Sequence, residues 1–355
     1  MKVCFFGSYS NKDFNLHLKN ILKAQGVEVI ECQSEINGFS SFVKSYFKLL
    51  FKHRKTNYDI MLIPWRGIMT LPLAKIIRRK PIVYFPFVSI FQTLVEDRKL
   101  IQKQSFKSKF VHFVDKTACK MSDMIILDTN ENINYFCEEF NLKKNKFRRL
   151  FVTSEETIFH PLPIKKRNKI FNVLFFGTYI PLHGINVIVE AAKILSNQKD
   201  IAFTLIGNGQ TRSQIEKMVK DYRLENIKFV NTVKLEMLPK FLEEADLCLG
   251  IFSGSKKTKL VIPFKVLIAF CSQKPLLTAD TPSIREAGLE NMKNCILVKA
   301  ESPSELSKAI LSIKENPKLL EQIAKEGYEN YKRKLSMEKA GKTLLKYLDE
   351  VISKP

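Results

Sequence analysis

The feature that most constrains the fold is the segment IFNVLFFGTYIPLHGINVIVEAAKIL, residues 170–195. An apolar run ends at Gly177, a turn with Pro181 follows, and after Gly184 apolar residues recur on one helical face. A strand, a glycine turn and a helix direct backbone N–H groups and a positive dipole end at a phosphate. His183 adds a side chain that can face this phosphate, although any α/β protein needs glycines at such turns.

Short apolar runs alternate with helical patterns along the chain, which predicts parallel sheets joined by right-handed crossovers. In the first half the strand candidates are residues 3–6, 27–31, 60–64, 82–85 and 124–128. In the second half they are residues 172–176, 202–206, 227–229, 247–251, 275–278 and 295–298. Two such series in 355 residues predict two doubly wound α/β domains.

The domain boundary is expected in the stretch FHPLPIKKRN, residues 159–168, where two prolines and a basic run interrupt the periodicity. This places the first domain at residues 1–160 and the second at residues 170–335. Residues 336–355 are predicted to form a last helix with no strand after it. That this helix packs back on the first domain is a hypothesis.

Composition favours a protein of the reducing cytosol. Hydrophobic residues make up 45% and charged residues 26%, as in soluble globular proteins. The seven cysteines are scattered and form no CxxC pair, so neither a disulfide framework nor structural zinc is expected. The N-terminal apolar run is too short for a signal peptide, and no stretch reaches the ~18 apolar residues of a membrane span. We therefore expect a cytoplasmic protein without structural zinc.

The formal net charge is +22 and is divided evenly between the two halves. Residues 1–160 hold 26 Lys and Arg against 15 Asp and Glu, and the remainder holds 32 against 21, which gives +11 for each part. An even division argues against a basic arm for nucleic acid. Two explanations stay open, namely a composition typical of AT-rich codon usage and attraction to an anionic membrane surface.

One helix candidate bears on the membrane explanation. The segment GFSSFVKSYFKLLFKHRK, residues 38–55, carries an apolar stripe at helical spacing beside three lysines. The stripe consists of Phe39, Phe42, Val43, Tyr46, Phe47 and Leu50, and the lysines are Lys44, Lys48 and Lys52. An interfacial helix needs this pattern, and a helix that faces the core with a solvated edge also has it.

Two further segments of the second half are candidates for anion binding. The turn of LIGNGQ holds Gly207 and Gly209 between a strand and a helix, and a plain tight turn is its alternative. Lys265 follows Pro263, which suits the first turn of a helix. A lysine at that place is a poor match for the helix dipole unless an anion lies there, the alternative being a solvated lysine.

Taken together, FGTYIPLHG, LIGNGQ, LPKFLEEADLCLGIF and VIPFKVLIAFCSQKPLLTADTPSIRE resemble the donor half of family 4-type retaining glycosyltransferases with the GT-B fold. Order and spacing agree as well as the motifs, over most of residues 170–300. A weaker resemblance covers SIFQTLVEDR, residues 89–98, and residues 115–129. The resemblance implies two Rossmann-like domains that face a cleft.

The resemblance also implies an activity. It is the metal-independent transfer of a sugar, as in hexosyltransferases, from a nucleotide diphosphate donor with retention of configuration. The nucleotide sugar is a co-substrate, and no other cofactor is implied. The hypothesis for the acceptor is an envelope, lipid-linked or polysaccharide glycan, reached by a cytoplasmic enzyme that is peripheral on the inner face of the membrane. A dehydrogenase is disfavoured because no GxGxxG follows a strand.

The donor-binding residues assigned in this way are Gly177, Thr178, His183, Gly184, Gly207, Gly209 and Lys265. Many relatives have Arg and Lys where this chain has Thr178 and His183. Many relatives also have two glutamates that contact the donor sugar and the ribose. At the matching positions this chain has Leu260 and Ile268. The alternative function is therefore a nucleotide-sugar-binding GT-B protein that has lost transfer.

In the N-terminal half, the charged set Glu96, Asp97 and Arg98 is the catalytic candidate, and an ordinary surface helix is its alternative. Gly7 and Ser8 follow the first strand and are assigned to the acceptor side together with Ser89. For Gly7 and Ser8 a plain turn explains the sequence equally well.

Overall fold

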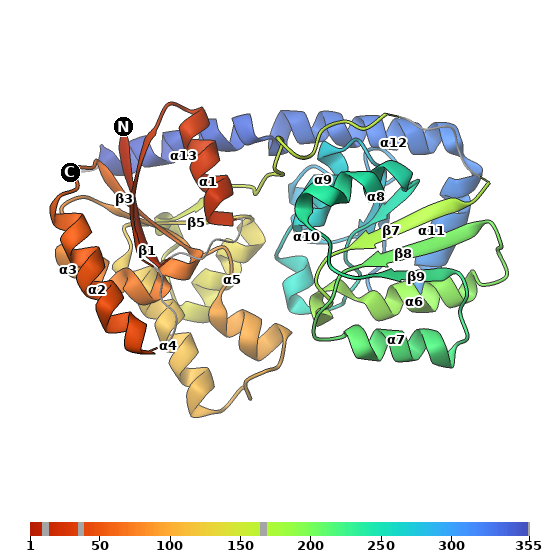
Figure 1. The fold of residues 1–355 in the computed structure, drawn as a ribbon, viewed down its shortest axis with the longest axis horizontal. Coiled ribbons are helices and arrows are strands. Elements are labelled where there is room, and N and C mark those ends of the chain that lie inside the picture. The colour runs from red at the N-terminus through yellow and green to blue at the C-terminus, as the bar shows by residue number, and fades with distance from the viewer. Residues whose placement is uncertain (9–13, 35–38, 164–168, 354–355) are drawn as a thin grey trace. The chain divides into compact units, whose positions relative to one another are not determined.

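The computed structural model describes residues 1–8, 14–34, 39–163 and 169–353, and the chain divides into two compact units (Figure 1). Unit 1 consists of Met1–Phe151 and Met337–Pro355, and unit 2 consists of Val152–Ser336. Each unit contains one six-stranded parallel sheet with helices on both faces. The prediction of two doubly wound α/β domains is confirmed.

The sheet of unit 1 has the strand order β2-β1-β3-β4-β5-β6. Its strands are β1 (Lys2–Ser8), β2 (Glu28–Ser34), β3 (Ile60–Pro64), β4 (Ile82–Phe85), β5 (Met124–Leu127) and β6 (Phe147–Arg149). The sequence analysis missed β6, because its three residues, FRR, include two arginines and give no apolar run.

Helices cover both faces of this sheet. They are α1 (Phe14–Ala24), α2 (Phe39–Arg54), α3 (Leu71–Ile77), α4 (Phe106–Met121), α5 (Asn130–Phe140) and α13 (Met337–Ile352). One face is covered by α1 and α13, which share a core with Val3, Phe5, Leu62 and Val83. An ion pair from Arg148 to Glu350 joins α13 to the edge strand β6. The last helix of the chain thus completes the core of the first unit.

The sheet of unit 2 has the strand order β12-β11-β10-β7-β8-β9. Its strands are β7 (Phe171–Phe176), β8 (Ile201–Ile206), β9 (Ile227–Val230), β10 (Leu247–Leu249), β11 (Leu276–Ala279) and β12 (Ile296–Val298). From β7 the chain builds outward through β8 to β9, then returns to the other side of β7 and continues from β10 to β12. The strand order therefore reverses between β7 and β10, which is where doubly wound sheets bind ligands.

The helices of unit 2 are α6 (Ile185–Ile194), α7 (Arg212–Asp221), α8 (Leu238–Glu244), α9 (Phe264–Cys271), α10 (Pro282–Glu286), α11 (Pro303–Glu315) and α12 (Pro317–Asn330). Residues of α6, α7 and α11 pack on one face of the sheet. Helix α9 provides seven consecutive buried residues, from Lys265 to Cys271.

The chain passes from unit 1 to unit 2 at Phe151–Val152, earlier than the expected boundary between residues 160 and 170. The reason is that the segment before the prolines packs within unit 2. Phe159 is buried and its carbonyl accepts a hydrogen bond from the Cys271 thiol, while Tyr331 donates from its hydroxyl to Glu156. Within the described ranges, no helix is long and apolar enough to cross a bilayer.

Candidate nucleotide-binding site

Gly177 follows β7 directly, at the point where the strand order of unit 2 reverses. Its φ of +144° lies in a region that side chains disfavour, so the turn requires glycine. A Cβ at this position would lie 2.9 Å from Nζ of Lys265 and 3.3 Å from the His183 ring. Three residues predicted to bind the donor therefore meet around one backbone position.

The two glycine turns of unit 2 pack directly against each other. A Cβ on Gly207, whose φ is +133°, would lie only 2.0 Å from the Gly177 carbonyl oxygen. The Gly177 N–H donates to Ile206, and the Tyr179 N–H donates to the carbonyl of Asn208. A side chain at Gly209 would in turn meet the backbone of Tyr179. The turns predicted from FGTYIPLHG and LIGNGQ thus form one rigid backbone surface.

Lys265 is the most unusual charged group of this surface. Its side chain is 5% exposed, and its Nζ has no hydrogen-bond partner among the described residues. The ammonium lies 3.8 Å from the centre of the Phe175 ring, and burial lowers the pKa of Lys265 well below its usual range. A buried cation that lacks an anionic partner costs free energy, which a bound anion would offset. The alternative of a solvated lysine is excluded by this burial.

His183 and Thr178 lie on the same loop, and Gly184, another predicted donor-binding residue, follows His183 directly. The Nδ1 atom of His183 donates to the Thr178 carbonyl at 2.5 Å, which sets the orientation of the buried ring. The side chain of Thr178 is exposed. Gly184 precedes α6 with a φ of +62°, and no side chain caps that helix. The first turn of α6 therefore keeps N–H groups for a ligand.

A cavity of about 320 Å³ opens beside this uncapped helix end. Its lining residues are Ile180, Pro181, Gly184, Ile185, Asn186, Val187, Thr211, Gln214, Ile215, Ser253 and Glu301. The volume is at the lower end of the range for small-molecule sites. The carboxylate of Glu301 lies against Gly254, where a Cβ would come within 2.4 Å of its Oε2. The cavity thus combines backbone donors with a carboxylate that can accept hydrogen bonds from hydroxyl groups.

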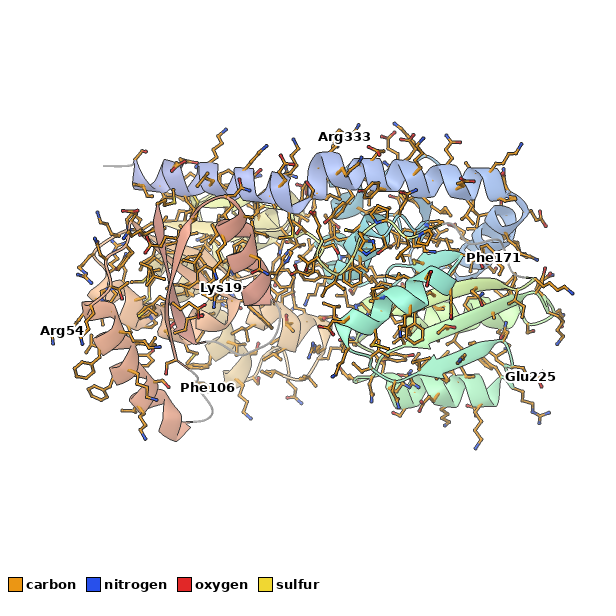
Figure 2. All side chains as sticks on the ribbon, turned by 45° about the horizontal axis from the view of Figure 1, so that its top comes forward. Lys19, Arg54, Phe106, Phe171, Glu225 and Arg333 are labelled. Carbon is orange, nitrogen blue, oxygen red and sulfur yellow. The ribbon has the colours of Figure 1, made fainter. Side chains whose placement is uncertain are left out.

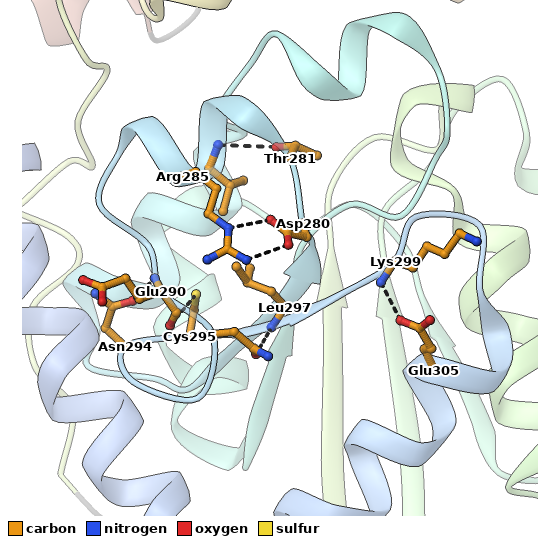
Figure 3. Close-up of polar contacts among 11 residues, drawn as sticks. Asp280, Thr281, Arg285, Glu290, Asn294, Cys295, Leu297, Lys299 and Glu305 are labelled. Carbon is orange, nitrogen blue, oxygen red and sulfur yellow. Dashed lines mark hydrogen bonds and ion pairs between the residues drawn. The ribbon is translucent and has the colours of Figure 1, made fainter.

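Two other cations of unit 2 are engaged by protein groups. Arg212 is paired with Glu216 and donates to the Tyr179 hydroxyl and the Gly207 carbonyl, which fastens the two turns together. Figure 3 shows Arg285 donating to the Asp280 carboxylate from both Nε and Nη2, each at 2.7 Å. Lys265 differs from both arginines in having no such partner among the described residues.

Among the candidates of unit 1, Gly7 occupies a structural position. Gly7 lies inside β1 with a φ of +122°, and a Cβ there would lie 2.5 Å from Oγ1 of Thr70. The glycine thus permits a close approach of the 3₁₀ segment Trp65–Thr70. The side chain of Ser8 lies outside the described part of the structure.

Ser89 is fully buried and fixes the loop after β4. Its hydroxyl donates to Asp115 at 2.7 Å and accepts from the Gln92 N–H at 2.9 Å. Asp115 also accepts from the Phe91 N–H, and burial raises the pKa of this carboxyl to about 6 against the effect of these hydrogen bonds. This geometry gives Ser89 a positioning role.

The charged set of residues 96–98 lies at the end of a π-helix, Gln92–Asp97. Asp97 is buried, Arg98 is half-buried, and Glu96 accepts from the Tyr135 hydroxyl at 2.8 Å. The set is therefore not an ordinary surface helix. π-Helical turns occur frequently at functional sites, and the catalytic assignment stays a prediction.

Sequence reasoning missed two groups that the structure brings to the site, Arg212 and Glu301. Arg212 follows the second glycine turn by three residues and could have been found from that spacing. Glu301 lies almost a hundred residues further along the chain, in the turn after β12, and gave no local signal.

Comparison with known proteins agrees with this geometry. Residues 154–330, which span nearly all of unit 2, match the family model described as glycosyl transferases group 1. Through this domain the chain belongs to the group 1 glycosyl transferases. A relative of this glycosyltransferase is the uncharacterized glycosyltransferase MJ1069 of Methanocaldococcus jannaschii, 23% identical over 325 residues, 87% of this chain and 79% of that protein.

Two solved structures have the same fold as this glycosyltransferase over nearly the whole chain. Sucrose-phosphate synthase of Thermosynechococcus elongatus has a TM-score of 0.78 at 14% identity, with 99% of both chains covered. HepE of Anabaena in complex with UDP-glucose has a TM-score of 0.74 at 13% identity, with 99% of this chain and 100% of that chain covered. At these identities the likeness concerns the fold alone, and that fold is GT-B.

Proposed function

We propose that this glycosyltransferase binds a nucleoside diphosphate sugar in unit 2 and transfers the sugar to an acceptor hydroxyl. The observation that carries the proposal is the buried ammonium of Lys265 beside Gly177. A diphosphate placed there would give this cation its missing partner and would lie near the uncapped N-terminus of α6. HepE, a protein of the same fold, has been solved with UDP-glucose.

The proposed chemistry follows from these charges. The bond from the sugar C1 atom to the β-phosphate oxygen breaks, and C1 bonds to the acceptor oxygen, whose proton is released. Lys265, the α6 N–H groups and a protonated His183 would stabilise the negative charge that develops on the leaving diphosphate. We propose that these groups take the place of a metal and that no cofactor besides the nucleotide sugar is needed. Retention of configuration rests on the resemblance to family 4-type enzymes.

We assign the nucleoside hydroxyls to the cavity beside α6. Leu260 and Ile268 stand where many relatives have glutamates, and their apolar side chains have no atom that accepts a hydrogen bond from a hydroxyl. Glu301 supplies a carboxylate to the cavity instead. Because a carboxylate repels phosphate but accepts from hydroxyls, we propose that Glu301 contacts the ribose.

The acceptor proposal is an envelope, lipid-linked or polysaccharide glycan, used by a cytoplasmic enzyme peripheral to the membrane. The acceptor-side assignment in unit 1 is Gly7, Ser8 and Ser89, and the catalytic assignment is Glu96, Asp97 and Arg98. Buried Ser89 acts there through the loop that leads into the π-helix.

The second candidate is a nucleotide-sugar-binding protein of the same fold without transferase activity. It is favoured by the specific observation that Leu260 and Ile268 offer apolar side chains where relatives have carboxylates. This candidate predicts donor binding without turnover.

The experiment is a binding titration of the full chain against UDP, GDP, ADP, CDP and their sugars, followed by a donor hydrolysis assay. We expect one nucleoside diphosphate to bind and its sugar to be slowly hydrolysed. Lys308→Met provides the control, because Lys308 is exposed on α11 of the same unit, away from the glycine turns.

The outcomes separate the two candidates. Binding of a nucleotide sugar without hydrolysis, and without transfer to a panel of glycan and lipid acceptors, would favour the inactive binding protein. If no nucleotide sugar binds at all, both candidates are wrong.

A further inference from the structure

Helix α2 leaves a row of large apolar side chains uncovered. Phe47 is 60% exposed and Phe51 is 64% exposed, and Val43 precedes them one turn earlier at 53%. The opposite side of the helix faces the core through the buried Leu49 and His53. The described part of the apolar stripe is therefore only partly core, while the side chains of Phe39 and Phe42 lie outside the described residues.

Helix α4 carries a second exposed row that the sequence analysis did not single out. Phe106, Phe110 and Phe113 are 84%, 52% and 63% exposed, at a spacing of four and three residues. The same helix faces the core through Asp115 and Cys119. Figure 2 labels Phe106 on this helix and Arg54 at the end of α2.

Both helices lie on the same face of the sheet of unit 1. The His53 ring of α2 packs on Phe6, with 6.1 Å between ring centres. Burial and then the Asp115 carboxylate of α4 raise the pKa of Tyr84. Phe5 pairs with Leu62 and Leu62 pairs with Val83, and these three side chains belong to the core of α1 and α13. Because successive residues of a strand point to opposite faces, Phe6 and Tyr84 both point to the other face. The core of α1 and α13 lies on the other face.

The segment that contains these helices is strongly basic. Residues 39–121 contain 17 Lys and Arg against 4 Asp and Glu, a net charge of +13 in less than a quarter of the chain. More than half of the total charge of +22 is thus concentrated here, which the division into halves concealed. Exposed lysines stand next to both apolar rows: Lys44 and Lys48 on α2, and Lys107 and Lys109 on α4.

We propose that α2 and α4, on the same face of the unit 1 sheet, together dock this face on an anionic lipid bilayer. The phenylalanines would enter the boundary between headgroups and acyl chains, and the lysines would contact lipid phosphates. A second copy of the chain is a poorer occupant, because it would bring two sets of lysines together. The proposal does not depend on the donor chemistry of unit 2.

The test is flotation of the full chain, without nucleotide, with vesicles of phosphatidylcholine alone or mixed equally with phosphatidylglycerol. We expect binding to the mixed vesicles only, reduced by added salt. Lys107→Glu with Lys109→Glu should weaken binding roughly 25-fold or more, from about fivefold per lysine. Phe106→Ser with Phe110→Ser should weaken it about tenfold or more. The control, Lys318→Glu with Lys325→Glu on α12, changes the net charge equally and should have little effect.

If the control pair lost vesicle binding to the same extent, the proposal would be overturned, because the loss would then depend on the net charge of the protein and not on the position of the lysines. Binding to neither vesicle would also overturn it, as would dimers in sedimentation that the phenylalanine variants abolish. Nucleotide affinity in solution is measured on the same variants and is expected to be unchanged. Failure of vesicle binding is thereby distinguished from failure of the proposed donor site.

Discussion

Replacing Lys265 by methionine should make the protein more stable and a poorer nucleotide binder at once. Methionine keeps the length and apolar stem of the side chain but removes a buried ammonium that has no hydrogen-bond partner among the described residues. The penalty for burying this group, either as an ion or as an amine held neutral by its lowered pKa, is several kcal/mol, and the contact of the ammonium with the Phe175 ring returns about 2 kcal/mol of it. A net stabilisation of about 1–2 kcal/mol follows.

The same change removes a charge-assisted contact to the diphosphate. Such a contact contributes about 1.5–3 kcal/mol, so the dissociation constant for the nucleoside diphosphate should rise roughly 10- to 150-fold. Stability and binding therefore change in opposite directions, as is common where a site keeps an unfavourable group for function.

Thermal unfolding and calorimetric titration measure the two effects. Unit 2 spans residues 152–336, so a gain of 1–2 kcal/mol should raise its midpoint by about 2–8 °C. A methionine variant that is less stable than the parent, and binds the nucleotide equally well, would refute the reasoning. Lys308→Met should leave both quantities unchanged.

Three further predictions concern other parts of the molecule. Gly177→Ala should cost about 1–3 kcal/mol and reduce nucleotide affinity, whereas Gly26→Ala, also at positive φ but with open space around its Cβ, should leave affinity unchanged. Burial lowers the pKa of Lys265, and a bound diphosphate should raise it again, so nucleotide binding should be accompanied by uptake of a proton. Nucleotide affinity should therefore fall as the pH rises between the pKa of the free protein and that of the complex. Calorimetric titration in buffers of different ionisation enthalpy measures the proton uptake, which Lys265→Met should abolish. Leu344→Ala in α13 should destabilise unit 1 by about 2–5 kcal/mol in denaturant titrations followed by Trp65 fluorescence, and the exposed Lys346→Ala should not.

Much of the fold could be predicted because its strands are buried on both faces. Runs such as Ile60–Pro64 and Ile82–Phe85 are continuously apolar, and the structure has both strands at those bounds. The three-residue β6, in contrast, has two arginines and is held by pairing with β5, a long-range condition that no local pattern reveals.

The candidate site could be predicted where single segments carry its geometry. Gly177 and Gly207 each predicted a turn from the local sequence, but the packing of the two turns against each other is a tertiary contact that only the structure shows. The burial of Lys265 could not be predicted, because charged residues are almost always solvated and only the fold shows otherwise. The exposure of Phe106 and Phe110 could not be predicted either, because apolar residues at helical spacing are expected to face a core.

The placement of α13 has a consequence for how the protein is made. Unit 1 is assembled from two pieces separated by the 185 residues from Val152 to Ser336. At the usual pace of translation, roughly 10–40 s pass between the end of the first piece and the start of the second. During that interval α1 alone covers this face of the first sheet, and the part that will meet Leu344 and Leu348 has no permanent cover. The second domain can therefore finish folding while the first is still an intermediate that is prone to aggregation.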